Sequence, residues 1–128
     1  MPQKIEIIAE NVQVRAELND GPTAKKIISK LPIEASAQRW GGEIYFSIPV
    51  TAGLESDSRD VLEAGELGFW PTGNAFCIFF GPTPASQGDE IRAASAVNII
   101  GKMKSDWAKL WDVSSGSSIV IKAIGGSN

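Results

Sequence analysis

Histidine is absent from this 128-residue chain, and cysteine occurs once. Without histidine the chain cannot build a Ser-His-Asp or Cys-His nucleophile, nor a zinc site with an imidazole ligand. A single cysteine excludes an internal disulfide and a thiolate metal cage. We therefore expect no metal and no cofactor. Enzymes that work only through Asp, Glu, Arg, Tyr or Lys remain possible.

An excess of basic charge and a long apolar run are also missing. Lysine and arginine number 12 against 15 acidic residues, a net charge of −3, so we expect no nucleic-acid partner. No window approaches the roughly 18 apolar residues of a membrane span, and the opening "MPQKIEIIAEN" lacks a secretory apolar core. We expect one cytoplasmic domain, residues 1–128, that makes no membrane contact.

What the chain does contain is short alternating strands. "KIEII" and "VQVRAEL" predict a hairpin across Glu10 and Asn11. "IEASAQR" and "EIYFSIPV" are joined by "WGG", whose glycines suit a tight turn, and "ELGFW" and "AFCIFF" by the turn "PTGN". "AVNIIGKM" and "SSIVIKAI" read as the closing strands, and the polar stretch "TAGLESDSRD" predicts a mobile loop.

Two short helices are expected among these strands. Apolar residues in "NDGPTAKKIISKLP" recur with helical spacing, starting near Asn19 or Asp20 and ending at Pro32. "SDWAKLW" predicts the second helix, with Ser105 as its cap. About eight strands and two helices indicate an antiparallel barrel or sandwich with helical plugs. A closed barrel is favoured because it leaves no strand edges exposed.

The order of these segments resembles that of cyclophilins. The resemblance rests on "VRAELNDGPTAKKIISKL", "GELGFW", "NAFCIFFGPTPASQGDE" and "VNIIGKM". The combination "RWGGEIYFSIPV…GELGFWPTGNAFCIFFGPTPAS…NIIGKM" is similar to a compact prokaryotic cyclophilin-like family of unassigned function. The resemblance implies a mainly β fold, a closed eight-stranded antiparallel barrel with a short helix capping each end. It also implies a site on the outer face of the barrel, where cyclophilins seat a proline ring beside an arginine.

Several pocket positions depart from the cyclophilin pattern. Ala75 stands where cyclophilins carry glutamine, Cys77 where they carry the pocket phenylalanine, Ala85 where they carry tryptophan and Glu90 where they carry histidine. Arg39, before the "WGG" turn, lies in roughly the part of the chain that holds the cyclophilin arginine, a placement by order along the chain. The expected function is therefore binding of a small molecule or short peptide in a reshaped pocket. The alternatives are a peptidyl-prolyl cis-trans isomerase, or an isomerase or lyase that uses Glu90.

We expect the candidate ligand-binding residues to surround one shallow pocket. They are Arg39, Tyr45, Trp70, Cys77, Glu90 and Arg92.

Four of these residues also have a purely structural interpretation. Glu90 and Arg92 can form a surface ion pair, Arg39 can pair with Glu43 across the turn, and Cys77 can be a buried small apolar side chain. Trp40, Trp107 and Trp111 can serve packing alone. A third class of function is association into a homodimer through an exposed strand edge.

Overall fold

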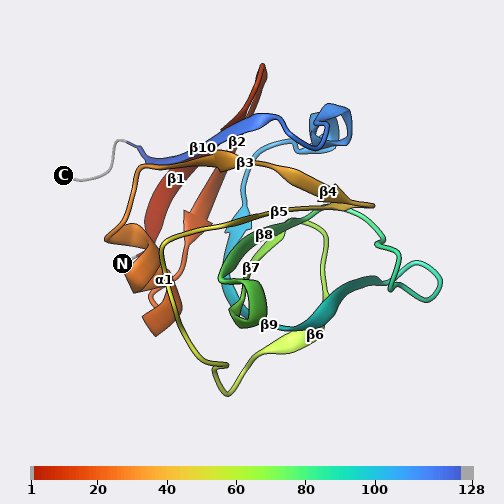
Figure 1. Ribbon diagram of the computed structural model, residues 1–128, viewed down its shortest axis with the longest axis horizontal. Helices are drawn as coiled ribbons and strands as arrows, with labels where there is room; N and C mark the ends of the chain where they lie inside the picture. Colours follow the sequence, from red (N-terminus) through yellow and green to blue (C-terminus); the bar gives the residue numbers. More distant parts are fainter. Residues whose placement is uncertain (1, 125–128) are drawn as a thin grey trace.

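The computed structural model describes residues 2–124, and in this range the chain folds into ten strands, one α-helix and two 3₁₀ helices (Figure 1). The ends of the predicted domain, residue 1 and residues 125–128, lie outside this range. In chain order the elements are β1 (Gln3–Ala9), β2 (Val12–Leu18), α1 (Pro22–Ile28), β3 (Ile33–Ser36), β4 (Gln38–Trp40), β5 (Glu43–Ser47), β6 (Arg59–Leu62), β7 (Glu66–Trp70), η1 (Pro71–Gly73), β8 (Ala75–Phe79), β9 (Ile91–Met103), η2 (Ala108–Asp112) and β10 (Ser118–Ala123).

All strand pairings are antiparallel, and they join the ten strands into one sheet. Its order is β3-β10-β1-β2-β9-β7-β8-β5-β4, with β6 added beside β9. The predicted mainly β, antiparallel fold is confirmed. The structure has ten strands where eight were expected. One expected strand is divided at Ala37 into β3 and β4, and the additional strand β6 begins in the last two residues of the predicted loop. The second predicted short helix is the 3₁₀ helix η2. At its start the side chain of Asp106, and not the predicted Ser105, accepts the amide of Ala108.

The main core lies on one face of this sheet. Alternate residues of β2, such as Val14 and Leu18, are buried there as the sequence alternation predicts. Helix α1 packs against the core through Ala24 and Ile27. Its N-cap is Gly21, whose amide donates to the side chain of the predicted start residue Asn19 at 2.9 Å.

Strand β9 belongs to two layers at once. Its second half, residues 98–103, pairs with β7 and, at its end, with β2, whereas its first half pairs with β6. In Figure 1 the first half of β9 runs beside β6. It covers the face of the sheet opposite the main core, which we call the outer face, and buries a second apolar cluster there. The buried members of this outer cluster are Leu62, Ala75, Cys77, Phe79, Ile91, Ala93 and Val97.

Asn98 marks the point where β9 passes from one layer to the other. Its side chain is fully buried and donates to the Thr23 hydroxyl at 3.0 Å and to the Gly53 carbonyl at 2.9 Å. Its Oδ1 accepts the amide of Glu55 at 2.8 Å, and Glu55 in turn accepts the amide of Thr23. These bonds fix α1 and the segment before β6 to β9. Burial of a polar amide is tolerated because its hydrogen bonds are made.

Gly68 of β7 allows the first half of β9 to lie this close. A Cβ atom added at Gly68 would lie 2.8 Å from Cγ2 of Val97 and 3.2 Å from Cε2 of Phe79. Both distances are shorter than carbon atoms normally keep. The outer cluster therefore depends on a residue without a side chain in the middle of β7.

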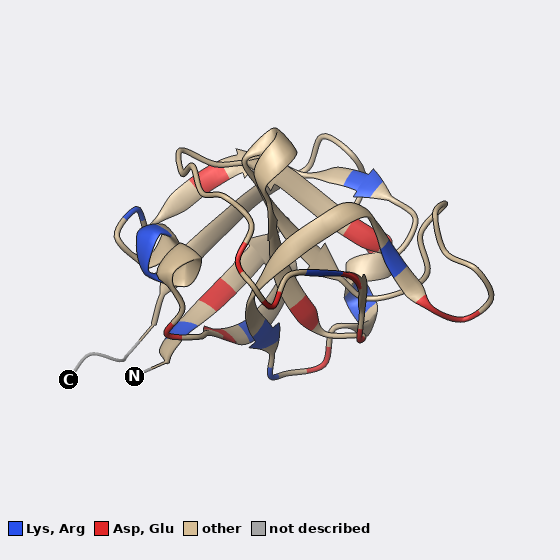
Figure 2. Ribbon diagram, turned by 90° about the horizontal axis from the view of Figure 1, so that it is seen from below, with Lys and Arg blue, Asp and Glu red and all other residues tan. Residues whose placement is uncertain are grey.

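Charges of both signs are spread over strands and loops in the view of Figure 2. Within residues 2–124, no helix is long and apolar enough to cross a membrane. Also within this range, no group of three or more acidic or cysteine side chains is placed to hold a metal ion.

Candidate functional site

A small cavity opens between the outer face of the sheet and the first half of β9. Its volume is about 120 Å³. Strands β4, β5 and β7 supply its aromatic and acidic wall, and β9 supplies its small apolar wall. The lining residues are Trp40, Glu43, Tyr45, Trp70, Ala93, Ala94 and Val97, which we call the outer pocket.

The register of the strands explains which side chains reach the outer pocket. Ile44 and Phe46 of β5 enter the main core, so their neighbours Glu43 and Tyr45 face outward. Tyr45 pairs with Cys77 of β8, which therefore also faces outward. Glu43, Tyr45 and Cys77 therefore share the outer face of the sheet.

Glu43 is the chemically distinctive residue of the outer pocket. The residue is only 5% exposed, because the first half of β9 covers this face of the sheet. Burial raises the pKa of Glu43 to about 7, and interaction with the Cys77 thiol offsets this only in part. A carboxyl group with such a pKa can give or take a proton at neutral pH.

Glu66, which with Glu43 makes up the buried carboxylates of residues 2–124, has the opposite environment. Arg59 donates to its two oxygens at 2.8 and 2.7 Å, and the amide of Glu63 donates at 2.8 Å. Burial alone would raise the pKa of Glu66, but these hydrogen bonds and the charge of Arg59 lower it. Within the part of the chain that is described, no lysine or arginine lines the outer pocket around Glu43.

Three of the six predicted site residues gather at the outer pocket. Tyr45 and Trp70 line it, and Cys77 is buried in the outer cluster beside Glu43. Burial and the neighbouring Glu43 carboxyl raise the pKa of the Cys77 thiol well above its usual range. The thiol is thus a neutral, buried side chain, as its apolar sequence context predicts.

Arg39 lies on the other face of the β4–β5 hairpin. It pairs with Ile44, whereas Trp40 pairs with Glu43, so the arginine cannot form the predicted ion pair with Glu43. Its guanidinium donates to the carbonyls of Gly41, Trp111 and Val113 at 3.0, 3.1 and 2.8 Å. It also lies 5.4 Å from the ring centroids of Phe80 and Trp111. Arg39 therefore anchors η2 to the sheet.

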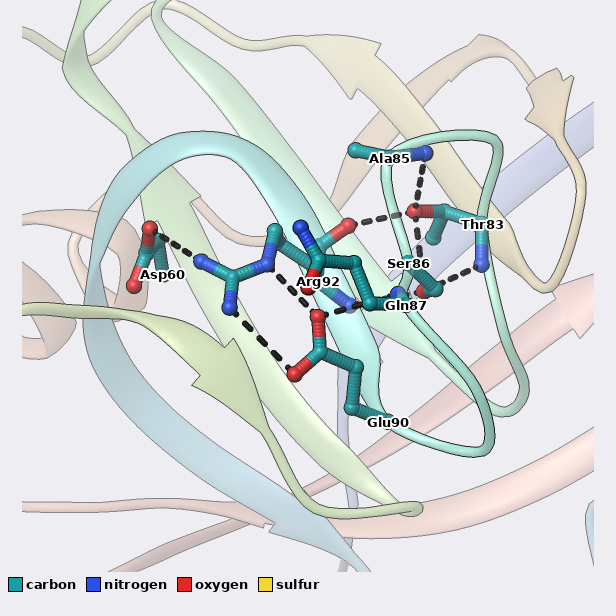
Figure 3. A network of polar contacts seen from close by, with 7 residues as sticks. All are labelled: Asp60, Thr83, Ala85, Ser86, Gln87, Glu90 and Arg92. Atoms are coloured by element: carbon teal, nitrogen blue, oxygen red, sulfur yellow. Dashed lines mark hydrogen bonds and ion pairs between the residues drawn. The ribbon is translucent and has the colours of Figure 1, made fainter.

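Glu90 and Arg92 also lie outside the outer pocket. Arg92 is not among the residues that line the cavity, and its guanidinium bridges Glu90 at 2.7 Å and Asp60 at 2.9 Å (Figure 3). This is the surface ion pair that the structural interpretation of the sequence predicts. The hydrogen bonds from Arg92 and from the amide of Gln87 lower the pKa of Glu90, which stays ionised at neutral pH.

The loop after β8 is held by its own polar contacts. The Ser86 hydroxyl accepts the amides of Thr83 and Arg92 at 2.9 and 3.1 Å, and the Thr83 hydroxyl donates to the Arg92 carbonyl (Figure 3). The Thr83 hydroxyl also accepts the Ala85 amide at 3.2 Å. These contacts clamp the loop to the start of β9. They position the strand that covers the outer pocket.

Sequence reasoning gave Trp40 a packing role and left Glu43 outside the site. The sequence feature that could have identified both residues is the tight turn "WGG". A hairpin across it pairs Trp40 with Glu43 and places an aromatic ring beside a carboxyl group on one face. Of the other tryptophans, Trp107 packs over Gly65, and Trp111 packs over Gly81 and edge-on against Phe80.

Comparison with known proteins places this geometry in a family. The model of the cyclophilin-like family matches residues 3–122. The solution structure of a hypothetical protein from Archaeoglobus fulgidus is similar, with a TM-score of 0.83 and 39% identity over 96% of this chain and 95% of that one. No curated protein matches the chain. The chain belongs to the cyclophilin-like family.

Proposed function

We propose that the outer pocket binds the ring or head group of a small molecule or short peptide. The observation that supports this most directly is the buried Glu43 carboxyl in a cavity that is also lined by Trp40, Tyr45 and Trp70. Binding sites in proteins typically combine an apolar, aromatic wall with a few polar groups that orient the ligand. The outer pocket has this composition.

The size of the cavity limits the ligand. A cavity of about 120 Å³ is close to the roughly 150 Å³ that accommodates a benzene ring. The group that enters is therefore about the size of a five- or six-membered ring or a branched head group. The rest of a larger ligand remains outside.

A fragment screen by ¹⁵N-detected NMR tests this proposal. We expect ring-sized fragments to shift the indole signals of Trp40 and Trp70 but not those of Trp107 and Trp111. Ala94→Leu fills the pocket from an exposed strand position and should abolish the shifts. Ala123→Leu, at an exposed position of β10, is the matched control and should leave them unchanged. Equal shifts in both variants would place binding elsewhere.

Peptidyl-prolyl isomerisation is the alternative function. The outer pocket lies on the face where the cyclophilin resemblance implies a proline site, and its volume suits a proline ring. Peptide-bond rotation has a barrier of roughly 18–20 kcal/mol, which a donor to the prolyl nitrogen can lower. No arginine lines the outer pocket within residues 2–124. The donor would have to be the protonated Glu43 carboxyl or the Tyr45 hydroxyl.

A coupled-protease assay on a series of Xaa-Pro peptides separates the two functions. A rate equal to that in buffer, beside an active cyclophilin as control, leaves binding as the function. Acceleration that is lost in Glu43→Gln and in Ala94→Leu would establish isomerisation in the outer pocket. Acceleration that survives both substitutions would contradict this site.

We also propose that the sheet closes into a barrel that supports the pocket. The strands at the two ends of the hydrogen-bonded order, β3 and β4, are consecutive in the chain and separated only by Ala37. The amide of Ala37 donates to the Ser117 carbonyl at 2.8 Å, and the Ala37 carbonyl accepts the Gly116 amide at 2.7 Å. Slow hydrogen exchange of these two amides is expected, whereas exchange at loop rates would argue for an open sheet.

A further inference from the structure

We propose that the group bound in the outer pocket is a methylated ammonium, the head group of a tertiary or quaternary amine. The proposal rests on the proposed function and names the class of ligand. It starts from three aromatic side chains, Trp40, Tyr45 and Trp70, which reach one cavity from three different strands. Aromatic faces around a small cavity attract cations, tryptophan most strongly, and sites of this kind recognise quaternary ammonium groups.

The second observation is a buried carboxyl without a cationic neighbour. Glu66 shows how this chain ordinarily buries a carboxylate, with a guanidinium bound to both oxygens. Glu43 is equally buried, and no lysine or arginine lines its cavity within the described part of the chain. A buried charge requires a partner of opposite sign. An ammonium ligand would supply the cation that the chain does not.

The third observation is the apolar wall formed by Ala93, Ala94 and Val97. A bare ammonium is strongly hydrated and would lose its water on entering such a cavity. Methyl groups reduce that hydration and gain contact with the apolar wall. The cavity of about 120 Å³ is also of a size suited to a trimethylammonium group. Methylated amines are therefore favoured over free lysine-type amines.

Binding of a cation requires the ionised form of Glu43, so affinity depends on pH. The titratable side chains that face Glu43 are Cys77 of β8 and Tyr45 of β5; β4, β7 and β9 contribute Trp40, Trp70 and apolar groups. The pKa of Glu43 is about 7, and the Cys77 thiol stays neutral. Affinity for the cation should rise about 30-fold between pH 5.5 and pH 8.5, as the ionised fraction of such a carboxyl does.

The test is an NMR titration of the full chain with choline and with its neutral isostere, 3,3-dimethylbutan-1-ol. At pH 8.5 we expect choline to bind at least tenfold more tightly, with shifts of the Trp40 and Trp70 indole signals. Glu43→Gln should remove this preference and its pH dependence while still binding the neutral isostere. Glu34→Gln, an exposed carboxyl on β3, is the charge-matched control and should change neither.

Two results would overturn the assignment and leave different conclusions. Equal affinity for the two probes at every pH, with the pocket indoles shifting, would refute the cation but retain the outer pocket as a binding site. No binding of choline at pH 8.5 would also refute the assignment of a methylated ammonium ligand. The fragment screen with Ala94→Leu would then show whether the outer pocket binds any ligand. The source of the head group follows from comparing choline with a peptide that carries trimethyllysine. Tighter binding of the peptide would support a modified side chain as the ligand, and equal affinity of the two would support a free amine.

Discussion

The indole nitrogen of Trp70 donates a 2.6 Å hydrogen bond to the hydroxyl of Ser95. The bond joins the end of β7 to the covering half of β9 and fixes one wall of the outer pocket. Ser95→Ala should leave the fold intact, because an exposed hydrogen bond contributes only about 1 kcal/mol to stability. It should weaken binding of pocket ligands several-fold, because the freed ring samples other orientations. Urea denaturation checks the stability, and the indole signal of Trp70 during a ligand titration checks the binding.

Glu43 should make the stability of the protein depend on pH in an unusual direction. Its pKa is raised from 4.5 to about 7, so the folded state holds this proton more tightly than the unfolded chain. The stabilisation is complete below pH 4.5 and is lost as the pH rises through 7. Glu43→Gln cannot ionise, so it should exceed the wild type in free energy of unfolding by about 3 kcal/mol at pH 8 and match it near pH 4.5. A difference that is constant with pH would contradict the buried environment of Glu43.

Glu66 should show the reverse dependence. Its pKa is lowered because hydrogen bonds from Arg59 and from the Glu63 amide outweigh burial. Its contribution to stability is therefore present above the ordinary carboxyl pKa and lost as the pH falls through the folded-state value. Glu66→Gln should cost about 2 kcal/mol at pH 7, with the cost shrinking in acid. Guanidinium unfolding at several pH values measures this, and a cost that grows toward low pH would be inconsistent with the pair.

Gly68 and Val97 should be coupled. Alanine at Gly68 brings its Cβ to 2.8 Å from Cγ2 of Val97, and such overpacking typically costs about 1–3 kcal/mol. Val97→Ala removes the atom that clashes. In a double-mutant cycle the two substitutions together should cost about 1 kcal/mol less than the sum of the single ones. Simple additivity would show that the covering half of β9 moves away freely instead of being held against β7.

Much of the fold could be predicted because its strands are half-buried. The alternation of "VQVRAEL" and "EIYFSIPV" assigns Val14 and Phe46 to the core, and the structure places both there. Strand β6 was missed because "SDSRD" is polar. Its pairing with β9 depends on a register that no local pattern contains.

The candidate site was harder to predict for a related reason. Alternation tells which face of β5 carries Glu43 but not whether another strand covers that face. The covering half of β9 buries Glu43 and turns a polar position into part of a cavity. Arg39 was placed near the site by its order in the chain, whereas the register puts its side chain on the opposite face. Predicting which side chains share the pocket requires the strand pairing, which residue type and position along the chain do not give.

Strand β9 is continuous from the cover of the outer pocket into the main sheet, with buried Asn98 bonded at the junction. Because Ala93 and Ala94 bring almost no side chain to that wall, the main chain itself limits the width of the cavity. On that side a slightly larger guest meets main chain instead of a rotamer that swings aside. At this wall, discrimination by size is then a property of the backbone, and moving the wall back would require remodelling the strand and not just exchanging one of its alanines.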